Sequence, residues 1–169
     1  MEHSRIGVLF VCHANLCRSP LAEGVFGERA RVRGVADRFL IDSAGCWADG
    51  GHMPHRNSVA VAARHGIDLT GLRSRGVEPG DLHRFDHILA MDRANLSDLQ
   101  RLRGLSAVGP VQPGKAKLRL LRHIMDPAAQ GPAADVADPV GHGVDSYEAT
   151  YALLLTAANA LLDELVGPA

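Results

Sequence analysis

An apolar run at residues 6–11 leads directly into a short polar loop, and a helical stretch follows that loop. The run reads Ile-Gly-Val-Leu-Phe-Val, which is typical of a buried strand. Similar runs recur at residues 39–43, 87–90 and 117–121, and helical patterns lie between them. Strands that alternate with helices in this way predict an α/β fold built on a parallel sheet.

The last helix has the clearest pattern. Residues 145–148, Asp-Ser-Tyr-Glu, resemble a capping box at its start. Apolar residues then recur at helical spacing, and we expect them to lie in the core. They are Tyr147, Tyr151, Leu154, Leu155, Ala158, Leu161, Leu162 and Leu165.

Other polar segments are predicted to be a cap and two loops. Asp92 precedes a helical pattern that runs through residues 96, 99 and 102, so it is a candidate helix cap. We expect surface loops at residues 104–114 and 126–143, where glycine and proline are frequent. The second loop is long enough to suggest a function.

Composition narrows the class of protein. The 169 residues suffice for one core, so we expect a single domain over residues 1–169, and a net charge of -1 argues against a nucleic-acid binder. No apolar run approaches the ~20 residues that cross a bilayer, and residues 1–5 lead into the first strand without a signal peptide. Three cysteines do not make a secreted disulfide framework. We therefore expect a cytoplasmic protein with no membrane or nucleic-acid partner.

The loop after the first strand places Cys12 and Arg18 at its two ends. Five intervening residues let the backbone curl so that successive N–H groups converge on one point, and such a ring of donors binds anions. Arg18 adds a two-pronged donor suited to phosphate oxygens. A cysteine beside a guanidinium at a helix N-terminus is stabilised as a thiolate. The loop is therefore predicted to cradle a phosphate, with Cys12 as the nucleophile at its floor.

The residues after Arg18 fit the start of a helix. Ser19 is a good N-cap, and Pro20 at the first helical position has no N–H to lose. The spacing of Cys12 and Arg18 is weak evidence by itself, because it arises by chance and cysteines near strands are often merely buried. The order of strand, loop and helix is what favours a catalytic site.

The chain resembles the low-molecular-weight protein tyrosine phosphatases. The signature is Val11-Cys12-x-x-Asn15-x-Cys17-Arg18-Ser19-Pro20-x-Ala22-Glu23, and further matches occur at residues 42–45, 65–69, 86–92 and 138–139. The resemblance covers nearly the whole chain. It implies a four-stranded parallel sheet flanked by helices on both faces, and a hydrolase that needs no cofactor or metal.

The same resemblance implies roles for particular residues. Cys12 would form a phosphocysteine intermediate, Arg18 would bind the phosphate oxygens, and Asp138 would be the general acid and base. The rest of the loop would bind substrate through His13, Ala14, Asn15, Leu16, Cys17 and Ser19. Ser43 matches a serine that supports the loop, although it could equally be an ordinary strand-end serine. Asn15 is expected to hold an unusual backbone conformation, because Asn tolerates the left-handed region.

Asp138 has rivals within the same region of the chain. Asp126 also precedes a proline, and Asp135 and Asp145 lie on either side of Asp138. Most loop aspartates are solvated turn residues. We favour Asp138 because it belongs to the second Asp-Pro pair, the one before the final helix, where the family places its general acid.

Several positions depart from the family pattern and bear on the substrate. Ala14 stands where Gly is usual, and Val140 and Gly141 replace the aromatic residues that usually wall the phosphotyrosine slot. Leu72 replaces a histidine that helps to anchor the loop asparagine. Trp47 could supply the remaining wall, or it could be a partly buried anchor of its own loop.

Related activities differ at a few residues. Leu16 favours phosphotyrosine, because relatives specific for phosphoarginine carry a small Thr there. Arsenate reductases with this fold need two further downstream cysteines, and none follows Cys46. Cys17 could form a reversible disulfide with Cys12 or could be an ordinary buried residue, while Cys46 is more plausibly incidental. We expect none of the nine histidines to hold a metal ion.

The resulting expectation is a cysteine-dependent phosphomonoesterase. Its partners would be a phosphotyrosine protein as substrate and inorganic phosphate as product. Two alternatives stay open: a phosphatase of a small phosphomonoester, and a phosphate-binding regulatory relative with little turnover. The intact set of Cys12, Arg18, Ser19 and Asp138 favours an enzyme.

Overall fold

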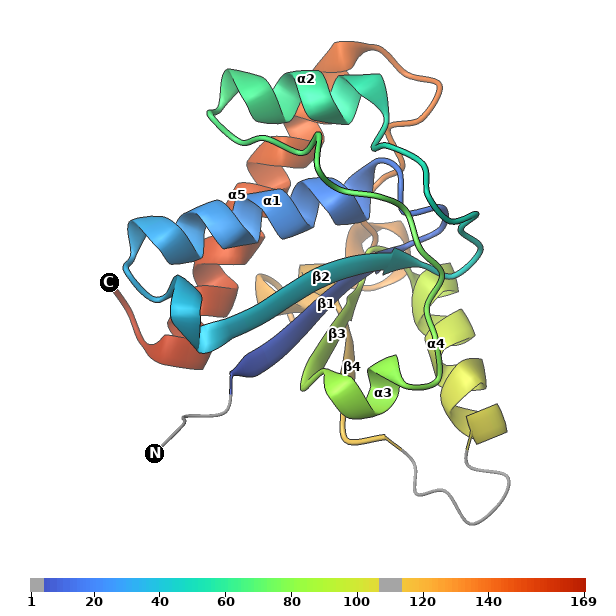
Figure 1. Ribbon diagram of the computed structural model, residues 1–169. Coiled ribbons are helices and arrows are strands. Elements are labelled where there is room, and N and C mark those ends of the chain that lie inside the picture. The colour runs from blue at the N-terminus through green and yellow to red at the C-terminus, as the bar shows by residue number, and fades with distance from the viewer. Residues whose placement is uncertain (1–4, 107–113) are drawn as a thin grey trace.

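The computed structural model describes residues 5–106 and 114–169. In this part of the chain four strands form one sheet, in the order β2-β1-β3-β4, and every neighbouring pair is parallel (Figure 1). The strands are β1 (Ile6–Cys12), β2 (Phe39–Gly45), β3 (His87–Ala90) and β4 (Lys117–Leu120). The predicted parallel sheet and its four strands are confirmed.

Helices cover both faces of the sheet. On one face lie α1 (Arg18–Val32) and α5 (Val144–Val166), with α2 (Arg56–Arg64) packed against them. The opposite face carries α4 (Arg93–Ser106), and the single turn of α3 (Asp81–Arg84) lies near it in Figure 1. Three short 3₁₀ turns among the described residues, Ala36–Arg38, Leu121–Ile124 and Gly131–Ala134, complete the connections.

Each face of the sheet has its own hydrophobic core. Side chains that alternate along β1 divide between them, because successive strand residues point to opposite faces. Val8 and Phe10 pack with α1 and α5, whereas Leu9 and Val11 pack under α4. The predicted core face of α5 is confirmed at Tyr147, Leu154, Leu161 and Leu162, each at most 2% exposed.

Two predicted helix starts are wrong by a few residues. Helix α1 begins at Arg18, so Ser19 lies inside its first turn and caps nothing. Helix α5 begins at Val144 after an N-cap Gly143, and Glu148 pairs with Arg64 instead of closing a capping box. In contrast, Asp92 caps α4 as predicted, because its Oδ1 accepts the Asn95 N–H at 2.8 Å.

Two further expectations need correction or fall outside the structure. Helix α4 continues to Ser106, so the loop predicted from residue 104 starts later, and residues 107–113 of that loop lie outside the described residues. The signal-peptide expectation rests on residues 1–5, of which 1–4 also lie outside.

By length and mean hydropathy α5 could cross a membrane, contrary to the expectation that no segment approaches this. Its buried face packs on α1, which is how a core helix behaves.

Burial predicts that truncation of a leucine on α5 destabilises the fold far more than truncation of an exposed leucine on α4. Leu161 on α5 is 0% exposed and Leu105 on α4 is 69% exposed. Leu161→Ala should lower the free energy of unfolding by about 2–5 kcal/mol, because it removes buried methyl groups and leaves a cavity. Leu105→Ala should change it by less than about 0.5 kcal/mol. Denaturant unfolding of both variants measures the contrast, and equal losses would contradict this packing.

Candidate active site

The carboxyl ends of the central strands define one edge of the sheet. The chain leaves β1 toward β2 on one side and β3 lies on the other, so the strand order reverses beside β1. Open α/β sheets bind ligands in the crevice at such a switch point. Cys12 ends β1 there, and Asp92 follows β3 by two residues. Cys12, the expected nucleophile, therefore lies at the position that the fold favours for a site, and Asp92 lies at the same edge.

The loop from Cys12 to Arg18 is held by its neighbours through the backbone. The carbonyls of Cys12, His13 and Leu16 accept N–H groups from the segment that follows β2. Gly45 at the end of β2 is needed for this close approach, because a Cβ there would lie 2.7 Å from the His13 carbonyl oxygen. Among the described residues, no backbone N–H of residues 13–17 donates to a protein acceptor. These donors are free to bind an anion.

Asn15 is the hub that fixes the shape of this loop. Its φ of 57° lies in the left-handed region, as the sequence predicts. The Asn15 Nδ2 donates to Ser19 Oγ at 2.8 Å and to Ser43 Oγ at 3.0 Å, and its Oδ1 accepts the Arg75 N–H at 3.0 Å. Asn15 is 2% exposed, so these bonds satisfy a buried amide. These bonds hold Asn15 in place without the histidine that the family pattern has at position 72. Here Leu72 occupies that position and packs against the hydrophobic core.

Ser43 links the Asn15 side chain to Glu23 through hydrogen bonds. The Ser43 hydroxyl donates to Glu23 Oε2 at 2.5 Å while it accepts the Asn15 amide. The pKa of Glu23 is raised from its usual 4.5 to about 7, mainly because the carboxyl group is buried. The Ser43 hydrogen bond and the nearby Arg75 oppose this rise, and the nearby Asp42 adds to it. Glu23 appeared in the sequence only as part of the signature. Its contact with Ser43 is a feature that sequence analysis missed.

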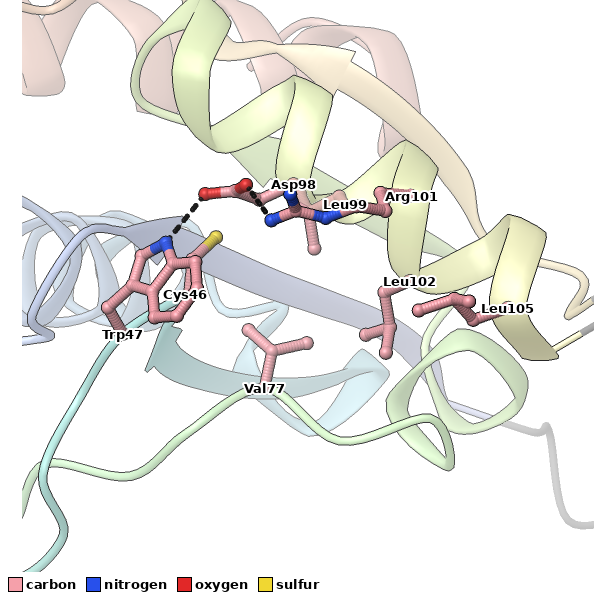
Figure 2. A pocket seen from close by; sticks show the side chains of 8 residues that line it. All are labelled: Cys46, Trp47, Val77, Asp98, Leu99, Arg101, Leu102 and Leu105. Carbon is pink, nitrogen blue, oxygen red and sulfur yellow. Dashed lines mark hydrogen bonds and ion pairs between the residues drawn. The ribbon is translucent and has the colours of Figure 1, made fainter.

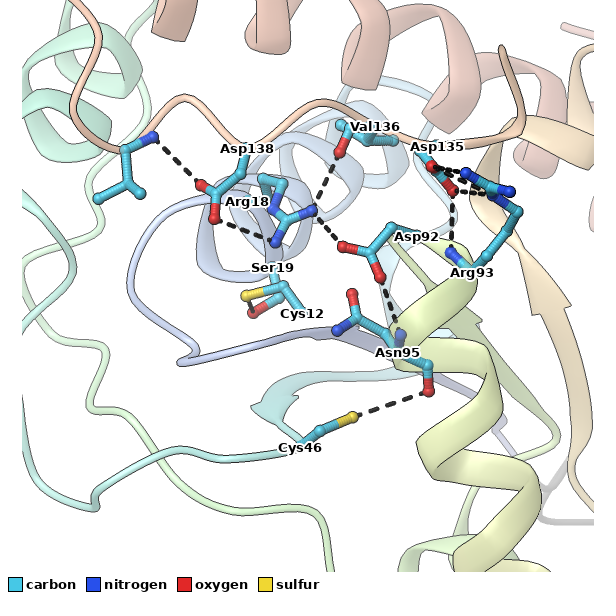
Figure 3. A network of polar contacts seen from close by, with 11 residues as sticks. Cys12, Arg18, Ser19, Cys46, Asp92, Arg93, Asn95, Asp135, Val136 and Asp138 are labelled. Atoms are coloured by element: carbon cyan, nitrogen blue, oxygen red, sulfur yellow. Dashed lines mark hydrogen bonds and ion pairs between the residues drawn. The ribbon is translucent and has the colours of Figure 1, made fainter. Parts of the chain in front are cut away.

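Cys12 and Ser19 face each other at the floor of the loop. The Cys12 Sγ lies 3.0 Å from the Ser19 Oγ, and the two side chains are drawn together in Figure 3. Cys12 is 3% exposed and Ser19 is fully buried. The position of Ser19 in the first turn of α1 is what aims its hydroxyl at the sulfur. Ser19 can donate a hydrogen bond to a thiolate there.

The Arg18 guanidinium is buried and held by three oxygens. Its Nη1 donates to Asp92 Oδ2 at 2.8 Å and to the Val136 carbonyl at 3.0 Å, and its Nη2 lies 3.4 Å from Asp138 Oδ2 (Figure 3). Arg18 is only 3% exposed, yet its Nε has no partner among the described residues. A buried cationic donor without a partner indicates an anion-binding position.

Asp92 is a site residue whose full role the sequence analysis missed. It was predicted only as a helix cap, but one carboxylate oxygen caps α4 and the other orients Arg18. The available signal was its position directly after a central strand, at the edge where the other site residues were expected.

The structure separates Asp138 from its rivals. Asp138 lies beside Arg18 and lines the same cavity as Cys12. Asp135 instead forms an ion pair with Arg93 at 3.0 Å, and Asp126 accepts the Ala128 N–H within its own turn. Asp145 lies in the first turn of α5. Of the four candidates, Asp138 alone is among the residues that line the Cys12 cavity.

The cavity at the loop has a volume of about 140 Å³. It brings together most of the residues predicted for the site, with Ala14 and Val140 at its aliphatic wall. The lining consists of Cys12, His13, Ala14, Leu16, Cys17, Arg18, His55, Asp138 and Val140. Asn15, Ser19 and Ser43 lie behind this surface as supports. His55 is a lining residue that sequence analysis missed, because no pattern links it to the loop.

Trp47 lies outside this cavity. Its indole Nε1 donates to Asp98 Oδ2 at 2.9 Å, and Arg101 lies over the ring (Figure 2). Together these three residues help to line a separate pocket between α4 and the loop after β2. The expectation that Trp47 walls the substrate slot is therefore not met in this structure, because Asp98 and Arg101 hold the ring elsewhere.

The remaining cysteines occupy different surroundings. Cys17 is buried, its Sγ lies 3.5 Å from the Tyr147 hydroxyl, and burial raises its pKa. Cys46 lines the Trp47 pocket, and burial raises its pKa to about 12. Within the described ranges no three His, Cys, Asp or Glu side chains are grouped to hold a metal ion.

The raised pKa of Glu23 predicts a pH-dependent stability. The folded state binds this proton more tightly than the unfolded state, so its contribution is complete below about pH 4.5 and is lost as the pH rises to about 7. Relative to Glu23→Gln, the wild type should therefore lose stability between pH 5 and pH 8. Urea unfolding across this range measures the difference. Glu28→Gln is the matched control, because the pKa of Glu28, on the same helix, is lowered by its hydrogen bond with Arg31. A wild-type protein that gains stability relative to Glu23→Gln over this range would contradict the assignment.

Comparison with known proteins gives one consistent result. The family model described as low molecular weight phosphotyrosine protein phosphatase matches residues 7–167. The low molecular weight protein-tyrosine-phosphatase YfkJ of Bacillus subtilis is 35% identical over 159 residues, which cover 93% of this chain and 94% of the relative.

Two solved structures extend the comparison. The crystal structure of YfkJ superposes with a TM-score of 0.82 at 31% identity, covering 98% of this chain and 97% of the other. A Drosophila arginine phosphatase also gives a TM-score of 0.82, at 28% identity, with 94% and 97% covered. These two proteins are named for different phosphorylated residues. With the Cys12–Arg18 loop at the switch point of the sheet and these matches along nearly its full length, the chain belongs to the low molecular weight phosphotyrosine protein phosphatases, a family of hydrolases.

Proposed function

We propose that this protein hydrolyses phosphomonoesters, most specifically phosphotyrosine in proteins, through a phosphocysteine intermediate on Cys12. The observation that carries the proposal is the buried Arg18 guanidinium, whose Nε has no partner in the part of the chain that the structure describes. Arg18 and Cys12 line the same cavity. The free backbone N–H groups of residues 13–17 add donors for the same phosphate. Donors of this kind stabilise the charge on the equatorial oxygens in the transition state.

In the first step the Cys12 thiolate attacks phosphorus. A P–S bond forms as the ester P–O bond breaks, and the departing oxygen takes a proton from the Asp138 carboxyl group. Asp138 suits this role because it lies at the cavity and contacts Arg18 only at 3.4 Å. The leaving group departs as a phenol or an alcohol.

In the second step water hydrolyses the phosphocysteine. The Asp138 carboxylate takes a proton from the water as its oxygen attacks phosphorus. The P–S bond breaks, inorganic phosphate leaves, and Cys12 returns as a thiolate. Ser19, whose Oγ lies 3.0 Å from the sulfur, donates a hydrogen bond that stabilises the leaving thiolate. Protein groups supply every step, so the reaction needs no metal or cofactor.

The substrate class rests on the cavity wall. Leu16 lines the cavity, and an aliphatic side chain favours a phosphotyrosine ring over the phosphoarginine side chain. One relative is named a protein-tyrosine-phosphatase, and one similar solved structure is named an arginine phosphatase. A phosphotyrosine protein in the cytoplasm is therefore the proposed partner, with inorganic phosphate as product.

Turnover of p-nitrophenyl phosphate by the reduced protein, with EDTA present, tests the mechanism. Cys12→Ser should abolish it, because the nucleophile is lost. Asp138→Asn should lower kcat by about 10²–10⁴, the usual contribution of a general acid. Asp126→Asn is the matched control, because Asp126 is the other Asp-Pro aspartate and caps only its own turn. Absence of turnover in the reduced wild type, or an Asp126→Asn loss as large as that of Asp138→Asn, would contradict the mechanism.

Exchange of Leu16 tests the substrate class. Wild type should hydrolyse a phosphotyrosine peptide more efficiently than a phosphoarginine peptide. Leu16→Thr should lower that preference by roughly tenfold, because one apolar contact with the ring is replaced by a small polar group. Ratios of kcat/KM for the two peptides measure the change. A wild-type preference for phosphoarginine would overturn the assignment.

A further inference from the structure

His55 stands between the phosphate loop and helix α2. Its backbone N–H donates to the Leu16 carbonyl at 2.7 Å, which ties it directly to the loop. It is also the N-cap of α2, because its Nδ1 accepts the Asn57 N–H at 3.2 Å. An Nδ1 that accepts leaves the proton of the neutral ring on Nε2.

The His55 ring is fixed by a second contact. It stacks on the Tyr147 ring with 5.3 Å between centroids and 13° between planes. Tyr147 is fully buried, so it provides a rigid support. Cap and stack together hold the imidazole in one orientation, and His55 is among the residues that line the Cys12 cavity. Such a ring can serve as a preorganised wall.

The cavity is suited to a flat apolar group. Its volume is about 140 Å³, and an apolar cavity of about 150 Å³ is known to hold a benzene ring. Ala14, Leu16 and Val140 supply aliphatic walls. His13 also lines the cavity but is exposed, and Trp47 lines a different pocket. His55 is therefore the lining ring that the described residues hold in place from two sides.

We infer that the His55 ring is the specificity-determining wall for the substrate's leaving group and selects a flat aryl phosphate over an alkyl phosphate. This inference rests on the proposed function, since it assigns the substrate class of the same site. The ring contacts the leaving group by offset or edge-to-face packing, as aromatic pairs prefer. It compensates for the aromatic residues that Val140 and Gly141 replace.

Two substitutions at His55 separate the contribution of its ring to the cavity wall from its contribution as the N-cap of α2. His55→Asn keeps a side-chain oxygen that can cap α2 but removes the ring. His55→Phe keeps a ring that can stack on Tyr147 but removes the cap. His52→Asn is the matched control, because His52 is an exposed histidine of the same loop and does not line the cavity. Thermal unfolding of each variant reports the cap separately from the wall.

Calorimetric binding of phenylphosphonate and methylphosphonate measures the wall without turnover. Wild type should bind phenylphosphonate more tightly. His55→Asn should lower that preference by roughly three- to tenfold, as expected for loss of one aromatic contact, with the affinity for inorganic phosphate changed less than twofold. His55→Phe and His52→Asn should retain the preference. An unchanged preference in His55→Asn, or an equal loss in His55→Phe, would overturn the inference.

Turnover distinguishes failure of this inference from failure of the proposed function. The ratio of kcat/KM for p-nitrophenyl phosphate to that for glycerol phosphate should fall in His55→Asn by the same factor as the binding preference. If wild type binds phenylphosphonate selectively but turns over neither ester, the proposed mechanism is wrong and the role of the His55 ring in selecting aryl groups is retained. If wild type turns over both esters and His55→Asn leaves the ratio of their kcat/KM values unchanged, the proposed mechanism is retained and the role of the His55 ring is wrong.

Discussion

The buried Arg18 guanidinium is the interaction on which the site depends. A charge at 3% exposure is unfavourable unless it is paired and hydrogen-bonded, and its partners come from distant parts of the chain. Asp92 follows β3, while the Val136 carbonyl and Asp138 belong to the loop before α5. The pairing of this one cation therefore places Asp138, the candidate general acid, beside the cavity that Cys12 lines. Among the described residues it also leaves Nε of Arg18 without a partner.

A network of hydrogen bonds around Asn15 supports the same loop. Asn15 holds a left-handed backbone only because its amide reaches Ser19, Ser43 and the Arg75 N–H. Ser43 in turn depends on Glu23, whose pKa is raised by burial to about 7. Loss of one member would leave buried donors or acceptors unpaired, which costs more than the bond itself contributes. The loop is thus shaped by side chains that do not line the cavity.

The sequence predicted the parts of the site that are local in the chain. Cys12, Asn15 and Arg18 lie within one strand-loop-helix unit, and the structure brings them together as expected. Ser19 was predicted as a helix cap, but the helix starts at Arg18, two residues before the predicted first helical residue Pro20, and helix propensity rules do not reveal this. Trp47 was expected at the wall, yet its indole pairs with Asp98 on α4. His55 was missed, because its stack on Tyr147 joins positions 92 residues apart.

By itself the sequence determined the α/β class, the order of the strands in the chain, and the loop from Cys12 to Arg18 that carries the family signature. These follow from hydrophobic periodicity and from a spacing that acts over a few residues, which is information that neighbouring side chains carry. Only the tertiary structure decided which carboxylates pair with Arg18, that Glu23 lies next to Ser43, and that His55 lines the cavity. Those contacts depend on how helices and loops pack across the sheet, because burial and pairing arise between residues that the chain order keeps apart.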